Sequence, residues 1–280
     1  MGKIKIILKA LWNNSSGRIG LVIVGAFSII SLGAPLFSPF DPSAQNLSMS
    51  VRPPSFSHLL GTDLFGRDLL SRLIYGARVS MGIGISAAFI AVLFGTLVGL
   101  TTGFLKGWTD KILMRSVDIL LGFPKLFIVL LAVGLGTPSI WLTVAVLGAL
   151  SWMEVARIVR GEVILVREMN YVKAATALGL KSSAIIFRYI LPNVISTIIV
   201  STTLLIGTMI LVEATLSFLG LGVQPPDASW GTIMNQGRAD PLGAWWISTF
   251  AGLSIIITLI GFNLLGDGLR DILDPRRKTT

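Results

Sequence analysis

Long stretches of apolar residues without a single charge dominate the pattern of this chain. Five such runs occur, at residues 19–37, 79–105, 126–153, 189–212 and 241–266. Because a helix needs roughly 20 apolar residues to cross a bilayer, each run is long enough to span a membrane. The pattern therefore predicts an all-α integral membrane protein.

The third run holds more than one helix. A cluster of turn-forming residues from Gly134 to Pro138 divides it. We expect its first half to join the segment from about Ile112 as one span and its second half to form another, which gives six transmembrane helices in all. The expected divisions are an N-terminal segment at 1–18, the first transmembrane helix at 19–38, a loop with an interfacial helix at 39–78, a five-helix core at 79–268 and a tail at 269–280.

The composition supports a membrane protein and argues against an enzyme. Of the 280 residues, 53% are hydrophobic and only 13% are charged, whereas about 25% are charged in an average globular chain. The chain has no cysteine and one histidine, His58, which excludes thiolate and histidine-rich metal sites. The glycine-rich phosphate loop that ends in Gly-Lys-Ser/Thr is missing. We therefore expect no cofactor on this chain and no ATP hydrolysis by it.

The net charge of +9 is distributed unevenly between the two sides of the predicted membrane. With a cytoplasmic N-terminus, 17 of the 23 basic residues face the cytoplasm, 5 face outward and Lys125 lies within a span. The 17 are four before the first span, three after the second, six from Arg157 to Arg188 and four from Arg270 onward. This asymmetry follows the positive-inside rule and predicts that both termini are cytoplasmic. Anionic lipid explains the basicity better than nucleic acid does, so we expect no nucleic-acid partner.

A proline- and serine-rich loop follows the first span and leads into a helical pattern. Its apolar stripe comprises Leu69, Leu70, Leu73 and Ile74. Asp63 with Arg67, and Asp68 with Arg72, have the spacing of ion pairs one turn apart on a helix. We expect an interfacial helix that lies on the outer leaflet before the second span.

Few ionisable residues fall within the predicted spans, and each costs roughly 2.5–3.5 kcal/mol at the bilayer centre unless it faces protein or water. Asp118 and Lys125 are seven residues apart, which places them on one face of the predicted third span, and Glu154 lies near the end of the fourth. For these three we favour helix-to-helix salt bridges, or partner contacts near the interface, over a place on the substrate path. Glu213, directly after the apolar run of the fifth predicted span, fits a substrate path and internal packing equally well.

A polar stripe follows the fifth predicted span, where Asn193, Thr197 and Ser201 recur at intervals of four. Residues four apart share a helix face. Such a stripe can line a water-filled path, but serine and threonine also bond to their own helix or join neighbouring helices. We favour packing here and keep path-lining as the alternative.

The segment from 171 to 193 is polar and rich in small residues, although it lies between two apolar spans. The residues that recur with the spacing of one helix face are Tyr171, Val172, Ala174, Ala175 and Leu178. The two alanines permit another surface to approach closely, and Gly179 follows where a glycine readily ends a helix. We expect two short helices that meet at Gly179, with Pro192 at the junction with the next span.

This segment resembles the cytoplasmic EAA loop of ATP-binding-cassette importer permeases, which is expected here at residues 162–191. The matching residues are Ala174, Ala175, Gly179, Ile190, Leu191 and Pro192. In that family the loop is a coupling helix that sits in a groove of the ATPase subunit, so the resemblance implies ATPase coupling through Tyr171, Lys173, Ala174, Ala175, Leu178, Gly179 and Pro192. The acid that names the motif is replaced here by Lys173.

A second stretch resembles the segment that marks the C-type permeases of dipeptide, oligopeptide and nickel importers. The matching residues are Gly61, Thr62, Asp63, Gly66, Arg67, Asp68, Ser71, Arg72, Gly76 and Arg78. Residues 217–231 and the stretch from Gly266 to Lys278 resemble the same group. The resemblance covers most of the chain after residue 17, and its motifs occur in the family's order.

The resemblance implies a type I importer permease in a bacterial or archaeal cytoplasmic membrane. Its implied partners are a homologous permease, two cytoplasmic subunits that bind ATP and Mg, and an extracytoplasmic substrate-binding protein. Short peptides are the expected substrates, and nickel or a metal chelate is the alternative. A self-contained secondary transporter is disfavoured because no inverted repeat is visible, and a membrane-embedded hydrolase because no nucleophile or metal constellation is present.

Overall fold

The computed structural model describes residues 2–105 and 107–273, which form helices and loops without a β-strand. The helices of the first half are α1 (Gly2–Asn13), α2 (Ser15–Leu32), α3 (Ala34–Phe37), a 3-10 turn at Leu47–Met49, α4 (Leu69–Leu105), α5 (Trp108–Leu121) and α6 (Lys125–Gly134). Those of the second half are α7 (Ile140–Arg167), α8 (Asn170–Ala177), α9 (Ser182–Ile185), a π-helical turn at Ile186–Ile190, α10 (Leu191–Phe218), α11 (Trp230–Gln236), a 3-10 turn at Gly237–Ala239 and α12 (Trp245–Leu273). The all-α prediction is confirmed.

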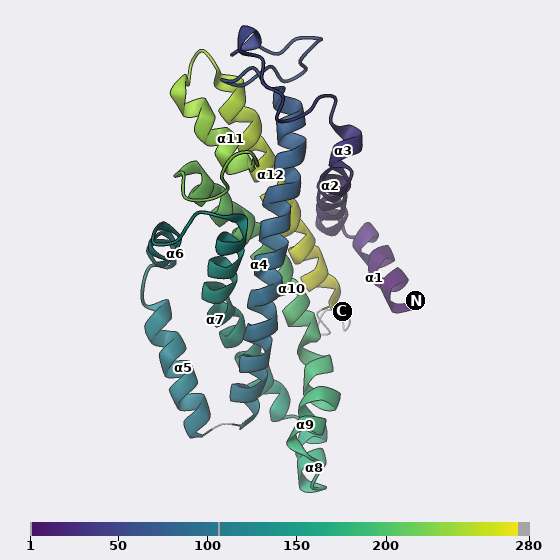
Figure 1. The fold of residues 1–280 in the computed structure, drawn as a ribbon. Helices are drawn as coiled ribbons and strands as arrows, with labels where there is room; N and C mark the ends of the chain where they lie inside the picture. Colours follow the sequence, from purple (N-terminus) through teal and green to yellow (C-terminus); the bar gives the residue numbers. More distant parts are fainter. Residues whose placement is uncertain (1, 106, 274–280) are drawn as a thin grey trace.

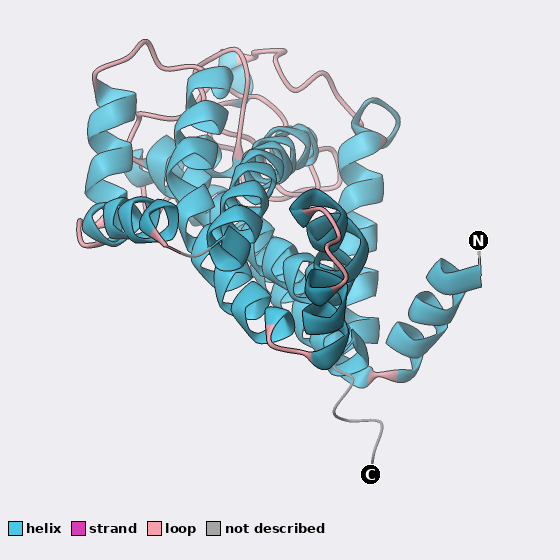
Figure 2. Ribbon diagram, turned by 90° about the horizontal axis from the view of Figure 1, so that it is seen from below, coloured by secondary structure: helices cyan, strands magenta, loops and turns pink. Residues whose placement is uncertain are grey.

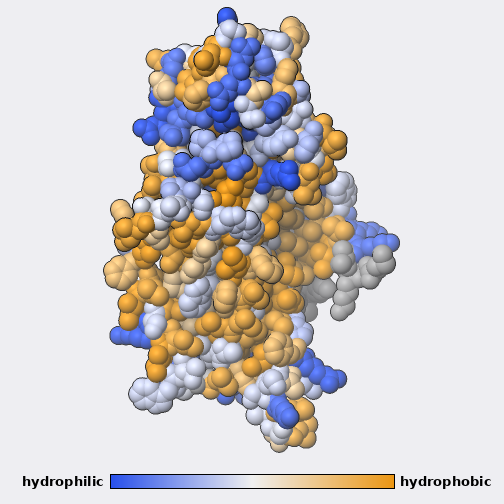
Figure 3. Space-filling model, viewed as in Figure 1, coloured by the Kyte–Doolittle hydropathy of each residue, from blue (hydrophilic) through white to orange (hydrophobic). Residues whose placement is uncertain are grey.

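The long helices stand roughly side by side and give the molecule two distinct ends (Figure 1). One end carries α8 and is called the α8 end; the other carries the loop at residues 38–68 together with α11 and is called the loop end. Viewed from the α8 end, the helices form an elongated cluster from which α1 projects (Figure 2). Apolar side chains cover much of the middle of the visible face, whereas hydrophilic residues gather at the loop end (Figure 3).

Within the described residues, five helices are long and apolar enough to cross a membrane, and a sixth span arises if α5 and α6 are taken together. That pair bends by 82° at Gly122-Phe123-Pro124, where proline lacks the amide hydrogen that would continue a helix. The prediction of six spans holds in this form. The prediction that Asp118 and Lys125 share one helix face is wrong, because the bend lies between them. Part of the predicted tail, residues 274–280, lies outside the described residues.

The second span begins earlier than the hydrophobic run suggested. Leu69 opens a continuous 37-residue helix, α4, and residues 59–68 before it form turns. The predicted interfacial helix is therefore wrong. Its apolar stripe forms the first turns of α4, and Leu69 and Leu73 are buried in the bundle.

The most extensive helix contact joins α4 to α7, which run parallel. Glycines 95, 99 and 103 of α4 face Val155, Val159 and Val163 of α7, each pair one turn below the last. A Cβ atom built on Gly99 would lie 2.7 Å from Val159 Cβ and 2.8 Å from the carbonyl oxygen of Ala156. Small residues let helix backbones approach in this way inside a membrane, where packing and not the exclusion of water drives association.

A methyl group at this contact tests its importance. Gly99→Ala should destabilise the chain by about 1–3 kcal/mol because the new Cβ overlaps backbone atoms of α7. Gly82→Ala is the matched control, because Gly82 lies on the same helix and a Cβ built on it would have no atom within 4 Å. The control should be neutral or slightly stabilising, since alanine favours a helix by about 1 kcal/mol over glycine. The measurement is the midpoint of thermal unfolding of both variants in detergent. Equal midpoints for the two variants would rule out a close contact at Gly99.

Candidate functional site

Two helices connected through a glycine turn form the tip of the α8 end, as the sequence predicts. Gly179 has φ +75°, and the amides of Gly179 and Leu180 donate to the carbonyl oxygens of Thr176 and Ala175. These two bonds form the motif that ends helices at a left-handed residue. An L-residue disfavours this conformation, so glycine fixes the angle between α8 and α9.

The helix α8 has an inward and an outward face. Val172 and Ala175 are only 1% and 4% exposed, and they pack in the core together with residues of α7 and α9. Tyr171 and Leu178 are 41% and 82% exposed, and Ala174 between them is exposed too. We call Tyr171, Ala174 and Leu178 the outer face of α8. The prediction of one face for all five residues is wrong, because the two alanines point in different directions.

Lys173, which replaces the acidic residue of the family motif, forms an ion pair with a residue near it in sequence. Lys173 Nζ lies 3.1 Å from Glu168 Oε2, and both side chains are more than half exposed. Pro192 lies in the first turn of α10, at the junction that the sequence predicts, although the helical segment continues from Ser182 to Phe218. The π-helical turn at Ile186–Ile190 directly precedes this proline in the chain, as expected where proline removes a hydrogen-bond donor.

A buried group of charged side chains joins the 38–68 loop to the start of α4. Asp63 is fully buried, and its carboxylate accepts hydrogen bonds from the amides of Phe65 and Arg67 and from Arg67 Nε, the last at 2.7 Å. Arg72 Nε lies 3.3 Å from the same carboxylate, and its Nη1 donates to the carbonyl oxygen of Pro42 at 3.4 Å. The Asp63–Arg67 pair was predicted, but it lies in a loop and Asp63 binds both arginines.

Asp68 has a different role from the one its spacing suggested. Its carboxylate accepts from the amide and hydroxyl of Ser71 and lies 2.9 Å from His58 Nδ1. The predicted pair of Asp68 with Arg72 is therefore wrong. Asp68 precedes α4 and satisfies a free amide of its first turn, as N-cap residues do.

The remaining motif residues near α4 shape the loop backbone. Gly61 and Gly66 have φ of +81° and +69°, and a Cβ on Gly66 would lie 1.8 Å from the carbonyl oxygen of Asn46. Thr62 is buried, and its carbonyl oxygen accepts from Trp246 Nε1 of α12. Arg78 is separate from the buried group, because it lies exposed in the third turn of α4.

Three ion pairs join α7 to the bent pair α5 and α6. Arg157 binds Asp118, Lys125 Nζ lies 3.0 Å from Glu154 Oε1, and Arg160 binds Asp110 through two bonds of 2.5 and 2.7 Å. The favoured prediction of helix-to-helix salt bridges is confirmed for Asp118, Lys125 and Glu154. The sequence reasoning missed Asp110, whose pairing with an arginine 50 residues later depends on the tertiary fold.

Glu213 lies in the interior between three helices. Its side chain is fully buried and accepts from Ser80 Oγ of α4 at 2.8 Å and from Ser217 Oγ at 2.7 Å. Ser80 Oγ also accepts from the amide of Trp230, the first residue of α11. Glu213 therefore joins α4, α10 and α11, and the structure does not place it on a path-lining surface.

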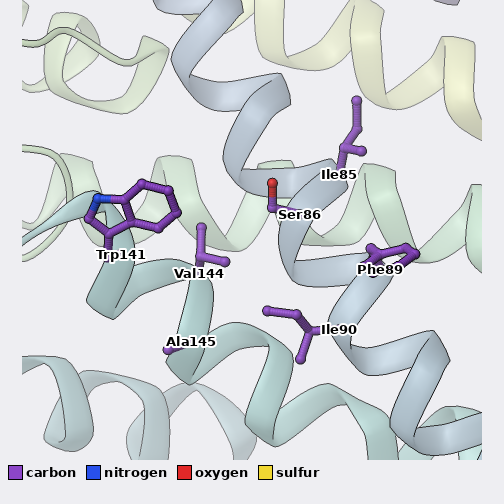
Figure 4. A pocket seen from close by; sticks show the side chains of 7 residues that line it. All are labelled: Ile85, Ser86, Phe89, Ile90, Trp141, Val144 and Ala145. Carbon is purple, nitrogen blue, oxygen red and sulfur yellow. The ribbon is translucent and has the colours of Figure 1, made fainter.

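The polar stripe of α10 remains partly accessible. Asn193 is exposed and its amide donates to the carbonyl oxygen of Tyr189 one turn earlier, whereas Thr197 and Ser201 are half-buried. A separate apolar hollow of about 470 Å³ lies between the middle of α4 and the first turns of α7 (Figure 4). Its lining residues are Ile85, Ser86, Phe89, Ile90, Trp141, Val144 and Ala145. It includes none of the predicted path residues.

The buried charges at the loop end yield a stability prediction. Asp63→Ala should destabilise the chain by about 3–5 kcal/mol, because two buried guanidinium groups lose their shared carboxylate. Asp41→Ala is the control, because Asp41 is exposed and its carboxylate bonds to its near neighbour Ser43. Thermal unfolding in detergent should give a clearly lower midpoint for the first variant alone. Similar midpoints for the two variants would contradict a structural role for Asp63.

Comparison with known proteins identifies the family. The family model of the binding-protein-dependent transport system inner membrane component matches residues 91–279, and that of the N-terminal transmembrane domain of oligopeptide transport permease C matches residues 4–54. A putative peptide transport system permease protein of Brucella abortus is 41% identical over 99% of this chain and 94% of its own length.

Two further relatives are similar over nearly the same length. The dipeptide transport system permease protein of Alkalihalophilus pseudofirmus is 40% identical over 97% of this chain and 89% of its own length. The oligopeptide transport system permease protein of Bacillus subtilis is 40% identical over 94% of this chain and 87% of its own. The chain therefore belongs to the family of membrane permease components of binding-protein-dependent, ATP-binding-cassette transport systems.

Proposed function

We propose that this chain is one of two permease subunits of an ATP-driven importer of short peptides, and that α8 couples it to an ATPase. The observation that supports this most directly is the outer face of α8. Tyr171, Ala174 and Leu178 are exposed at the tip of the molecule on a helix whose other side is packed in the core. An apolar face with a small residue at its centre suits insertion into a groove of a partner.

The proposed topology places the α8 end in the cytoplasm and the loop end outside. The excess of basic residues in the segments near α8 supports this orientation. One of the two ATP-binding subunits then meets the chain at α8, and these subunits hold ATP and Mg. A substrate-binding protein meets the loop end, and the homologous permease packs alongside within the membrane.

Transport in this proposal is driven by movement of α8. The helix follows α7 after two residues, Glu168 and Met169, and its inner face packs with residues of α7. Closure of the ATPases would displace α8 and α7 together and so tilt the spans between inward-facing and outward-facing states. We propose that Asn193, Thr197 and Ser201 line part of the path, because they share one face of α10 and retain access to the surface.

Short peptides are the proposed substrates because the three relatives described above bear the names of peptide, dipeptide and oligopeptide permeases. Another relative, the glutathione permease of Pectobacterium atrosepticum, is 39% identical over 81% of this chain and 75% of its own length. Among the described residues no group of three metal-binding side chains is present. A metal chelate therefore has less support than a peptide.

The two alanines of α8 should respond differently to a negative charge. Ala174→Glu lies on the outer face and should leave the fold and membrane insertion intact while it abolishes ATPase binding. Ala175→Glu places a carboxylate in the core and should destabilise the chain itself, by several kcal/mol. Copurification of the ATPase and thermal unfolding separate the two effects. Normal transport by the Ala174→Glu complex would contradict the docking role.

Cysteine labelling tests the topology, since the chain has no cysteine of its own. Gln45→Cys and Lys181→Cys change exposed residues at the loop end and at the α8 end. In intact cells an impermeant thiol reagent should modify the cysteine at 45 and spare the one at 181. Permeabilised cells are the control and should show both labelled. The reverse pattern in intact cells would overturn the proposed orientation.

The substrate class is tested with the complete importer in proteoliposomes. Peptides of two to five residues should stimulate ATP hydrolysis by the complex with its binding protein, whereas nickel complexes should not. Hydrolysis without the binding protein is the reference. Stimulation by a nickel complex with none by any peptide would reverse the substrate assignment and leave the permease assignment standing.

A further inference from the structure

The N-terminal helix α1 is amphipathic and stands apart from the bundle. It projects beside the end of α12, and its contacts are mainly with α2 and α12 (Figures 1 and 2). Its apolar residues Leu8, Leu11 and Trp12 follow the spacing of one helix face. Leu11 is 3% exposed, whereas Leu8 and Trp12 are 45% and 54% exposed. Half of the apolar face is therefore left uncovered.

The direction of α1 is set by contacts at its end. Asn14 caps α2 by accepting from the amide of Gly17 at 2.9 Å and donates to Asp271 Oδ2 of α12 at 3.3 Å. Gly17 and Gly268 approach so closely that a Cβ built on Gly268 would lie 2.4 Å from Gly17 Cα. Leu11 packs into this junction, with Cδ2 2.8 Å from a Cβ built on Gly17. The uncovered residues are thus held at one end of a membrane-spanning helix.

The charged residues of α1 itself are all basic, although the carboxylate of Asp271 lies at the end of the helix, where it binds Asn14. Lys5 and Lys9 are exposed on the helix, Arg18 is exposed one turn beyond it, and the first forty residues include no acidic residue. A tryptophan beside lysines is typical of helices at the membrane interface, where the indole ring lies among the headgroups and the lysines reach phosphate. An anionic lipid surface also suits a helix whose own charged residues are all basic.

We propose that α1 binds the membrane surface, with Leu8 and Trp12 in the headgroup and acyl boundary and Lys5 and Lys9 on anionic phospholipid headgroups. The helix leaves α2 where that span ends, so it starts at the bilayer surface. Lipid contact there would hold the α2–α12 junction through Leu11 and Asn14. This inference is independent of the substrate and of the ATPase.

Spin labels on the full-length chain test this. Leu8→Cys and Asn13→Cys carry a nitroxide in separate variants, and collisions with oxygen and with a water-soluble nickel complex are measured in vesicles of phosphatidylcholine with phosphatidylglycerol. The label at 8 should favour oxygen several-fold more than the label at 13, which lies on the polar side. Adding Lys5→Gln and Lys9→Gln should lower the equilibrium constant for binding of α1 to the bilayer surface about 25-fold, since each lysine contributes about fivefold. Lys181→Gln, far away at the α8 end, is the control and should change nothing.

Three results would overturn the proposal. If both labels collide equally with the nickel complex, α1 lies in water. If the label at 8 is shielded from both reagents, a protein surface covers it. If vesicles of pure phosphatidylcholine give the same oxygen preference and the lysine changes have no effect, the headgroup charge plays no part.

Discussion

The close contact of α4 with α7 is the constraint on which the rest of the structure depends. Three glycines of α4 lie against three valines of α7 at successive helix turns, and they also lie close to backbone atoms of α7. This contact fixes two parallel helices over much of their length. At one end α7 leads into α8, and at the other α4 begins in the buried charged group around Asp63. A displacement of α8 would therefore reach the loop end through a stiff pair of helices.

Charged groups hold the elements that packing alone leaves loose. The bent pair α5 and α6 has few contacts with α7, and three ion pairs join them. Asp63 joins the 38–68 loop to α4, and Glu213 joins α11 to α4 and α10 through serine hydroxyls. Burying a charge is costly unless it is paired or hydrogen-bonded, which explains why the buried carboxylates of Asp63 and Glu213 have their partners in place. The carboxylates of Asp118 and Glu154 are about half exposed.

Much of this architecture was predictable from local sequence. Uncharged runs locate the spans because a bilayer requires about 20 apolar residues, and Gly179 ends α8 with the positive φ that its position suggested. The family followed from motifs of this kind. The interpretation of Asp118, Lys125 and Glu154 as members of salt bridges between helices was right.

Other features depend on tertiary structure that no local pattern reveals. Leu69 opens α4 as a buried residue of the bundle, so its stripe faces protein and not the outer leaflet. Asp63 binds both arginines because the loop folds back on itself, and periodicity alone assigned Arg72 to Asp68. Glu213 is buried against α4, where its partner Ser80 lies 133 residues earlier in the sequence. The sequence did not distinguish the buried face of α8 from its exposed face, because the core that covers Ala175 includes residues of α9, beyond the turn.

The central claim is that the outer face of α8 meets the ATPase, and site-specific photo-cross-linking in the membrane tests it most directly. A photoreactive residue replaces Tyr171 or Leu178 on that face, and Leu242, which is 91% exposed at the loop end, is the reference position. The account predicts cross-links to the ATP-binding subunit from positions 171 and 178 and none from 242. Cross-links to that subunit from 242, with none from 171 or 178, would contradict it.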